Sequence, residues 1–227
     1  MLATTCPSCG AELHFRSSVT VSAVCASCGS LVLRTDVKVE AIGAMASLPD
    51  DISPMQVGTD LTIDGRHYTI LGRVRMYWAD GAWNEWFMDD GATPGWLIEA
   101  QGFFSVAFPL PMPPGFATNP WPALGTAITI DGVTYHVTDL KQATCAGSEG
   151  ELPFTAPRGR QVRYADLTGA DGGFAGLEEA EDGRTLYVGR NIHFDDVAFN
   201  NLRGVEGWVA PQASARLAGD PEYSPGP

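Results

Sequence analysis

The chain has 227 residues, of which 44% are hydrophobic and 18% are charged, a balance that suits one large globular domain or two small ones and excludes a disordered chain. The formal net charge is −13 and the basic residues are scattered, so the sequence lacks the positive stripe of a nucleic-acid-binding protein. No apolar run approaches the ~20 residues that cross a bilayer and no signal pattern opens the chain, so we expect a soluble, cytoplasmic protein without membrane insertion.

Two Cys-x-x-Cys pairs open the chain. Cys6 and Cys9 form the first pair, Cys25 and Cys28 form the second, and 15 residues separate them. Each pair can present two thiolates from one tight turn, and four thiolates make the tetrahedral site that Zn²⁺ accepts. We therefore predict a zinc ribbon over residues 1–35, with structural zinc because four cysteine ligands leave no open coordination position. Iron in the same four thiolates is the alternative.

The segment between the pairs predicts a hairpin, in which residues 12–16 run out and residues 19–24 run back. A module of fewer than about 40 residues cannot hold together through its core alone, so the metal would supply much of its folding free energy. Residues 36–52 are predicted to link the ribbon to the body. Cys145, the fifth cysteine, is interpreted as a buried structural residue.

The body of the chain contains a repeat. Residues 58–70 return as residues 125–137, displaced by 67 positions, and seven of the thirteen positions are identical. In each copy alternating apolar residues flank an Asp-Gly pair, which is typical of a two-residue type I′ hairpin. Glycine and proline divide the rest of the body into short runs, few of which sustain a 3.6-residue apolar period. The sequence therefore predicts an all-β fold.

The repeat continues more weakly past the hairpin, where one spacing of aromatic and glycine residues occurs twice: Trp86, Gly91, Gly95 and Trp96, then Tyr164, Gly169, Gly173 and Phe174. We predict two tandem, homologous antiparallel β subdomains, barrel-like or sandwich-like, over residues 53–108 and 123–210. The proline-rich residues 109–122 would connect them as a stiff segment, and residues 211–227 would form a flexible tail.

Several motifs together resemble a known family. The double zinc knuckle is followed by four further motifs: Ser53-Pro54, Gly58 through Gly72-Arg73, Trp83-Asn84-Glu85-Trp86 and Gly95-Trp96-Leu97-Ile98-Glu99. This pattern is similar to the bacterial domain-of-unknown-function family 4178, whose members often carry a zinc ribbon and often hold the domain in two copies. The resemblance implies no activity, because the family has none assigned. The second copy lacks the tryptophans, so chemistry at Glu85 and Glu99 would belong to the first copy alone.

The candidate site in the body combines aromatic and acidic residues: Trp83, Glu85, Trp86, Trp96 and Glu99. Ring faces and carboxylates both attract ammonium groups, so such a pocket suits a small cationic ligand such as a polyamine. Paired carboxylates could alternatively serve a hydrolase as acid and base. The residues could also be structural, with Trp86 and Trp96 filling a small barrel.

The sequence shows no metal-ligand spacing of histidines, no phosphate-binding glycine loop and no nucleophile elbow, so no catalytic residue is predicted. We expect a non-enzymatic protein-binding or scaffold protein, whose Trp-rich face contacts an unidentified protein partner. The alternative is a small-ligand binder or hydrolase that uses Glu85 and Glu99 in a Trp-lined pocket. Exposed tryptophans would favour the first hypothesis, and a cleft shared by the two glutamates would favour the second.

Overall fold

The computed structural model describes residues 2–35, 38–45, 48, 51–113, 116, 119–170 and 172–206. The predicted all-β class is confirmed, since the described residues form strands and one short 3-10 helix, η1 (Phe194–Asp196). The strands are β1 (Leu2–Thr5), β2 (Glu12–Phe15), β3 (Ser22–Val24), β4 (Ser30–Arg34), β5 (Val39–Ala44), β6 (Asp60–Ile63), β7 (Arg66–Trp78), β8 (Gly81–Asp89), β9 (Pro94–Ala100), β10 (Phe103–Leu110), β11 (Ala127–Ile130), β12 (Val133–Leu152), β13 (Gln161–Gly169), β14 (Phe174–Ala180), β15 (Gly183–Ile192) and β16 (Ala198–Asn200). Within the described part of the chain, no helix has the length and apolar character to cross a membrane. The predicted tail lies outside the described residues.

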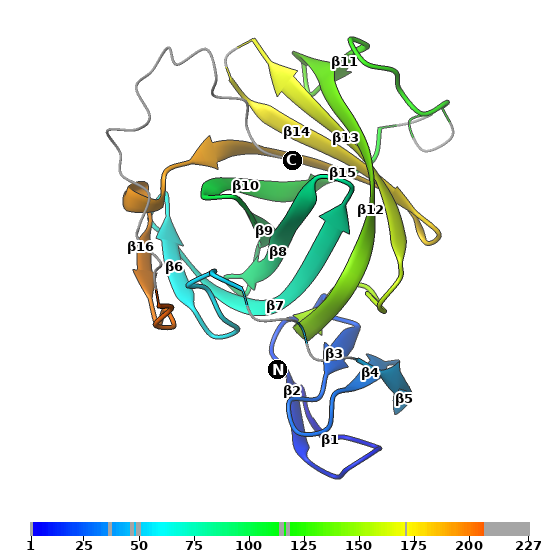
Figure 1. Ribbon diagram of the computed structural model, residues 1–227, viewed down its shortest axis with the longest axis vertical. Helices are drawn as coiled ribbons and strands as arrows, with labels where there is room; N and C mark the ends of the chain where they lie inside the picture. The colour runs from blue at the N-terminus through cyan, green and yellow to red at the C-terminus, as the bar shows by residue number, and fades with distance from the viewer. Residues whose placement is uncertain are drawn as a thin grey trace.

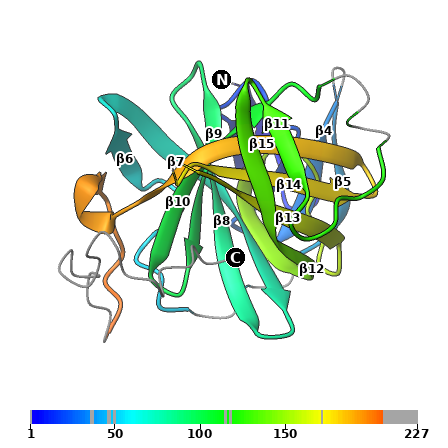
Figure 2. The same ribbon diagram turned by 90° about the horizontal axis from the view of Figure 1, so that it is seen from above.

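Eight strands close into one barrel. They pair in the order β7-β8-β9-β10-β15-β14-β13-β12, and β12 pairs back with β7. Figures 1 and 2 show the strands of both predicted β segments around a common interior. The two segments are thus halves of one barrel and do not form the separate subdomains that we expected. A four-stranded half alone would leave two strand edges unpaired, and each half supplies the edges that the other needs.

The two halves share local structure. Asp64-Gly65 and Asp131-Gly132 have positive φ at both residues, from 47° to 82°, which confirms the predicted two-residue hairpins between β6 and β7 and between β11 and β12. The β7–β8 register shifts between Ile70 and Gly72, and the β12–β13 register shifts at the same place 67 residues later. The strong part of the predicted repeat therefore occupies equivalent positions in the barrel.

The weaker part of the predicted repeat is out of register, by one residue at Trp86 and by two at Trp96. Counted from the shared register shift, the equivalent of Tyr164 is Glu85 and not Trp86, because Val74 pairs with Glu85 and Lys141 pairs with Tyr164. Neighbouring residues on a strand point to opposite faces of the sheet. Trp86 accordingly packs in a cluster outside the barrel, whereas Tyr164 packs in the interior cluster.

Both faces of the barrel wall are covered. The interior cluster includes Trp83, Phe87 and Trp96. Outside the first half, β6 and residues around η1 and β16 cover a second apolar cluster, and outside the second half β11 and the proline-rich connector cover a third. An apolar residue on a barrel strand can therefore face either way, which matters for the placement of the site.

The ribbon continues the barrel sheet. β3, β4 and β5 extend the sheet from the end of β12, where Ser22–Val24 pair with residues 150–152, and β1 pairs with β2 in a small separate sheet (Figure 1). The hairpin predicted between residues 12–16 and 19–24 does not form, because β2 pairs with β1 while β3 pairs with β4 and β12. Strand pairing thus fastens the ribbon to the barrel.

Candidate functional site

Four thiols gather in the ribbon. The Sγ atoms of Cys6, Cys9, Cys25 and Cys28 all lie within 4.8 Å of one another. The Cys6–Cys28 distance is 3.7 Å and the Cys9–Cys25 distance is 3.8 Å. Sulfurs bound at about 2.3 Å to a tetrahedral ion stand about 3.8 Å apart, so the four residues fit a metal ion. The structure therefore brings together all four predicted ligands.

The two turns that carry the thiols have the same geometry. The backbone N–H of Gly10 donates to the carbonyl of Cys6 and that of Gly29 donates to the carbonyl of Cys25, both at 2.8 Å. Both glycines have positive φ, 77° and 70°, a conformation that side chains other than glycine rarely adopt. One buried cluster of the ribbon consists of Cys6, Leu13, Cys25 and Val32. Two of the four candidate ligands, Cys6 and Cys25, are therefore part of the hydrophobic packing of the ribbon.

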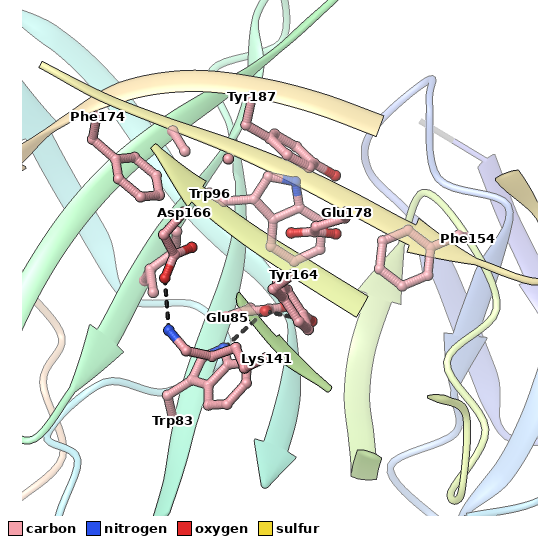
Figure 3. Close-up of a pocket in the computed structure, with 13 residues that line it drawn as sticks. Trp83, Glu85, Trp96, Lys141, Phe154, Tyr164, Asp166, Phe174, Glu178 and Tyr187 are labelled. Carbon is pink, nitrogen blue, oxygen red and sulfur yellow. Dashed lines mark hydrogen bonds and ion pairs between the residues drawn. The ribbon is translucent and has the colours of Figure 1, made fainter. Parts of the chain in front are cut away.

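A small cavity lies inside the barrel. Its volume of about 30 Å³ corresponds to about two water molecules. On β8 the alternating residues Trp83 and Glu85 face it, and the second half faces it from β13 and β14 (Figure 3). The wall combines aromatic and charged side chains: Trp83, Glu85, Trp96, Lys141, Phe154, Tyr164, Asp166, Phe174, Glu178 and Tyr187.

Most charged groups of the cavity are paired. The carboxylate of Glu85 accepts hydrogen bonds from Trp83 Nε1 at 2.8 Å and from the Tyr164 hydroxyl at 2.9 Å. The ammonium of Lys141 lies 2.6 Å from Asp166. Burial raises the pKa of Glu85 and of Asp166 although these partners oppose the shift. The paired groups form a satisfied polar lining.

Glu178 is different. Among the residues that the structure describes, its carboxylate has no hydrogen-bond or ion-pair partner, and it lies among the side chains of Trp96, Phe154 and Tyr187 (Figure 3). Burial and repulsion from Glu85 raise the pKa of Glu178 well above its usual value. Glu178 is thus a carboxylate in an aromatic setting that lacks a counter-charge at hydrogen-bonding distance.

The cavity adjoins a larger groove at one end of the barrel. This groove of about 360 Å³ shares Trp96, Phe154, Glu178 and Tyr187 with the cavity. Its rim includes the β14–β15 turn, where the guanidinium of Arg160 lies 2.6 Å from Asp182. The same guanidinium lies 4.8 Å from the ring centroid of Phe154. Glu178 therefore stands where the interior meets the mouth of the barrel.

Residues 56–194 match the family model described as "Domain of unknown function (DUF4178)". The match covers more than half of the chain. The chain belongs to the DUF4178 family. The match runs once, from before β6 into η1, so a single DUF4178 domain spans both halves of the barrel and leaves out the ribbon. Neither a curated protein nor a solved structure matches the chain.

The DUF4178 domain does not hold the five predicted site residues in one place. Trp83, Glu85 and Trp96 line the cavity. Trp86 and Glu99 lie on the outer face of the same strands, where Trp86 Nε1 donates to Glu99 at 2.9 Å. Strand alternation explains the separation, because Glu85 pairs with Ile98, the neighbour of Glu99. The two glutamates therefore do not share a cleft.

The outer residues of the DUF4178 domain belong to a buried polar network. Glu99 also accepts hydrogen bonds from Ser53 at 2.6 Å and from Asn84 at 3.0 Å. Asn84 in turn accepts from Arg73, whose guanidinium lies 4.8 Å from the ring of Trp86. These partners hold the segment before β6 against the barrel. The geometry assigns Glu99 a structural position.

The tryptophans offer no exposed face. Trp83, Trp86 and Trp96 are 3%, 0% and 6% exposed. An interface needs accessible rings, so the Trp-rich surface that we expected for a protein partner is absent from these residues.

Sequence reasoning missed the contribution of the second half, above all Glu178 and Tyr187. On β14 the apolar residues Ala175 and Leu177 point outward into the cluster under β11, and Gly176 and Glu178 point into the barrel. An alternating strand usually turns its apolar residues to the core and its glutamate to water. Because the outer face is covered here, the usual assignment is reversed, and no local motif signals the reversal.

Proposed function

We propose that this DUF4178 protein is a non-enzymatic binding protein, in which the barrel takes a small organic ligand through its mouth and a structural zinc ion holds the ribbon. One observation carries the proposal: a groove of about 360 Å³ leads onto an interior cavity, and aromatic residues line both. Ligand pockets in proteins measure about 300–1,000 Å³ and combine apolar walls with a few polar groups. The groove has this size and this composition.

A binding role agrees with the chemistry of the titratable groups. Glu85 and Glu99 face opposite sides of the wall, so the paired-carboxylate hydrolase that we considered loses its geometry. Burial raises the pKa of Cys145 to about 11, which makes this 1%-exposed thiol a poor nucleophile. The buried tryptophans favour a small ligand inside the barrel over a protein partner on that face.

Zinc is the metal that we propose for the four thiols. The sulfur spacing suits Zn–S bonds of about 2.3 Å, and a ligand set of four cysteines leaves no coordination position for a substrate. Such a site stabilises the fold and performs no chemistry. Free thiolates that bind metal persist in a reducing compartment, so we further propose a cytoplasmic location.

We also propose that the barrel arose by copying a five-strand unit. β6 to β10 and β11 to β15 occupy corresponding places, each begins with an Asp-Gly hairpin, and each carries the register shift at the same position. The two halves contribute different residues to one interior, because Trp83 and Trp96 come from the first half and Glu178 comes from the second.

The binding role is tested with benzyl alcohol, a small uncharged aromatic probe, followed by saturation-transfer NMR on the zinc-loaded full chain. The variant Ala180→Trp places an indole in the groove that Ala180 lines. We expect transfer to the probe with the unsubstituted chain and its loss with Ala180→Trp, with circular dichroism as the control for folding. Absence of transfer, or transfer that Ala180→Trp leaves intact, would contradict the proposal.

A further inference from the structure

The unpartnered carboxylate identifies the chemistry that the groove selects. Glu85, Glu99 and Glu151 are buried glutamates, and each accepts at least two hydrogen bonds from side chains or backbone groups. Glu178 accepts none among the described residues. The Glu178 side chain is half-buried, and even partial burial of an unpaired carboxylate costs free energy, so a ligand that supplies the missing charge would stabilise the fold.

The surroundings of Glu178 select for positive charge. Glu85, Asp166 and Asp182 act on Glu178 as like charges, and Arg160 is the cation that opposes them. Arg160 is already paired with Asp182 and lies over the Phe154 ring. The rings of Trp96 and Tyr187 line the same groove, and the face of an aromatic ring attracts cations. An anionic ligand would be repelled by these carboxylates, whereas a cation would be attracted to them.

The shape of the site selects the kind of cation. The interior cavity of about 30 Å³ holds a group the size of one or two water molecules. Only a compact charged group of the ligand therefore fits in the cavity beside Glu178. An ammonium group is compact and carries three donors, whereas a quaternary ammonium offers none. The groove of about 360 Å³ leaves room for a flat apolar stem beside the stacked rings of Trp96 and Phe154, which line it. A second positive charge on that stem would meet Arg160 at the rim.

From these observations we infer that the barrel mouth binds a primary monoamine with an aromatic or short apolar stem, whose ammonium group pairs with Glu178. The inference rests on the proposed binding function and gives it a ligand class. Trp96, Phe154 and Tyr187 enclose the stem, and Arg160 disfavours ligands with a second charge at the far end.

The experiment compares three probes of related size by isothermal titration calorimetry at pH 7: benzylamine, benzyl alcohol and 1,4-diaminobutane. Each probe is titrated into the full zinc-loaded chain and into three variants of it. The variants are Glu178→Gln, the matched charge control Glu181→Gln at an exposed position, and Ala180→Trp. We expect benzylamine to bind more tightly than the alcohol and the diamine. Glu178→Gln should weaken benzylamine by about tenfold or more, as for loss of a hydrogen bond to a charged group, and Glu181→Gln by less than about twofold.

The outcomes distinguish the ammonium inference from the binding function on which it rests. If benzylamine and benzyl alcohol bind equally and Ala180→Trp abolishes both, the groove is a binding site but the ammonium inference is overturned. If Glu178→Gln retains full affinity for benzylamine, the inference is overturned as well. If no probe binds the unsubstituted chain, both the inference and the binding function fail. Folding of each variant is verified by its thermal melt, and Glu178→Gln should fold because it removes an unpaired, half-buried charge.

Discussion

Removal of the Glu151 carboxylate should loosen the ribbon from the barrel. Glu151 lies on β12 and is 3% exposed. It accepts hydrogen bonds from the backbone N–H of Arg16 at 2.6 Å, from Arg16 Nε at 2.8 Å and from the Thr20 hydroxyl at 3.2 Å. All three donor groups belong to the ribbon. The substitution Glu151→Ala therefore removes the polar contacts that this side chain makes with the ribbon and leaves the strand pairing of β3 with β12 in place.

The loss of stability depends on which new hydrogen-bond partner each of the three donors can reach in the variant. A hydrogen bond to a charged group contributes about 1.5–3 kcal/mol to stability. The sum over three such bonds is an upper limit, and the expected loss is smaller. The side chain of Arg16 is 35% exposed and regains water, which discounts its share. Thr20 keeps a second bond, to the Ser17 carbonyl at 3.0 Å. The backbone N–H of Arg16 loses its acceptor. We expect Glu151→Ala to lower the free energy of unfolding by about 3 kcal/mol, and Glu151→Gln, which keeps one acceptor oxygen, by about half as much.

The assay is urea denaturation with two signals. All six tryptophans lie at or beyond Trp78, so their fluorescence reports the body of the chain, and a chromophoric chelator reports metal release from the ribbon. Glu151→Ala should shift metal release to lower urea by more than it shifts the fluorescence transition. The control is Glu149→Ala on the same strand, because Glu149 is 43% exposed and its contact with Arg73 spans 3.3 Å. If Glu151→Ala costs no more than Glu149→Ala, the assignment of Glu151 as the fastening group is refuted.

Three further predictions concern the metal and Glu178. Cys9→Ser should lose the bound metal and unfold the ribbon while the barrel tryptophans keep their folded emission; unchanged metal content by mass spectrometry would count against the four-thiol site. The pKa of Glu178 is raised in the folded state, so its negative charge destabilises the fold at pH values above the unfolded-state pKa. Glu178→Gln should therefore raise the melting temperature at pH 7 and leave it unchanged at pH 4. A lower melting temperature of the variant at pH 7 would contradict this. Because an ammonium ligand needs the deprotonated carboxylate, benzylamine affinity measured by calorimetry should rise as pH rises through that raised pKa, and a flat profile would contradict the assignment.

The metal site and the hairpins could be predicted because their signals are local. Two Cys-x-x-Cys pairs followed by glycine determine two equivalent turns, and the four sulfurs then need only one contact between the turns to meet. The Asp-Gly pairs likewise require positive φ at adjacent residues, and few residues other than Gly, Asn and Asp accept it.

The closure of the barrel and the composition of its interior could not be predicted because they depend on contacts distant in sequence. β10 pairs with β15 and β7 pairs with β12, and no local pattern distinguishes this arrangement from two separate sheets. Because both faces of the barrel wall are covered, the alternation of apolar and polar residues along a strand does not tell which face points inward. Glu85 and Trp86 are both buried, on opposite faces, and only the full fold shows which one shares the interior with Glu178.

The most direct test of the binding account is a crystal structure of the zinc-loaded chain with benzylamine. The account predicts the amine nitrogen about 2.7–2.9 Å from a carboxylate oxygen of Glu178, with the ring in the groove against Trp96 and Phe154. Density for the amine outside the barrel mouth, or an amine in the mouth that leaves Glu178 without contact, would contradict it.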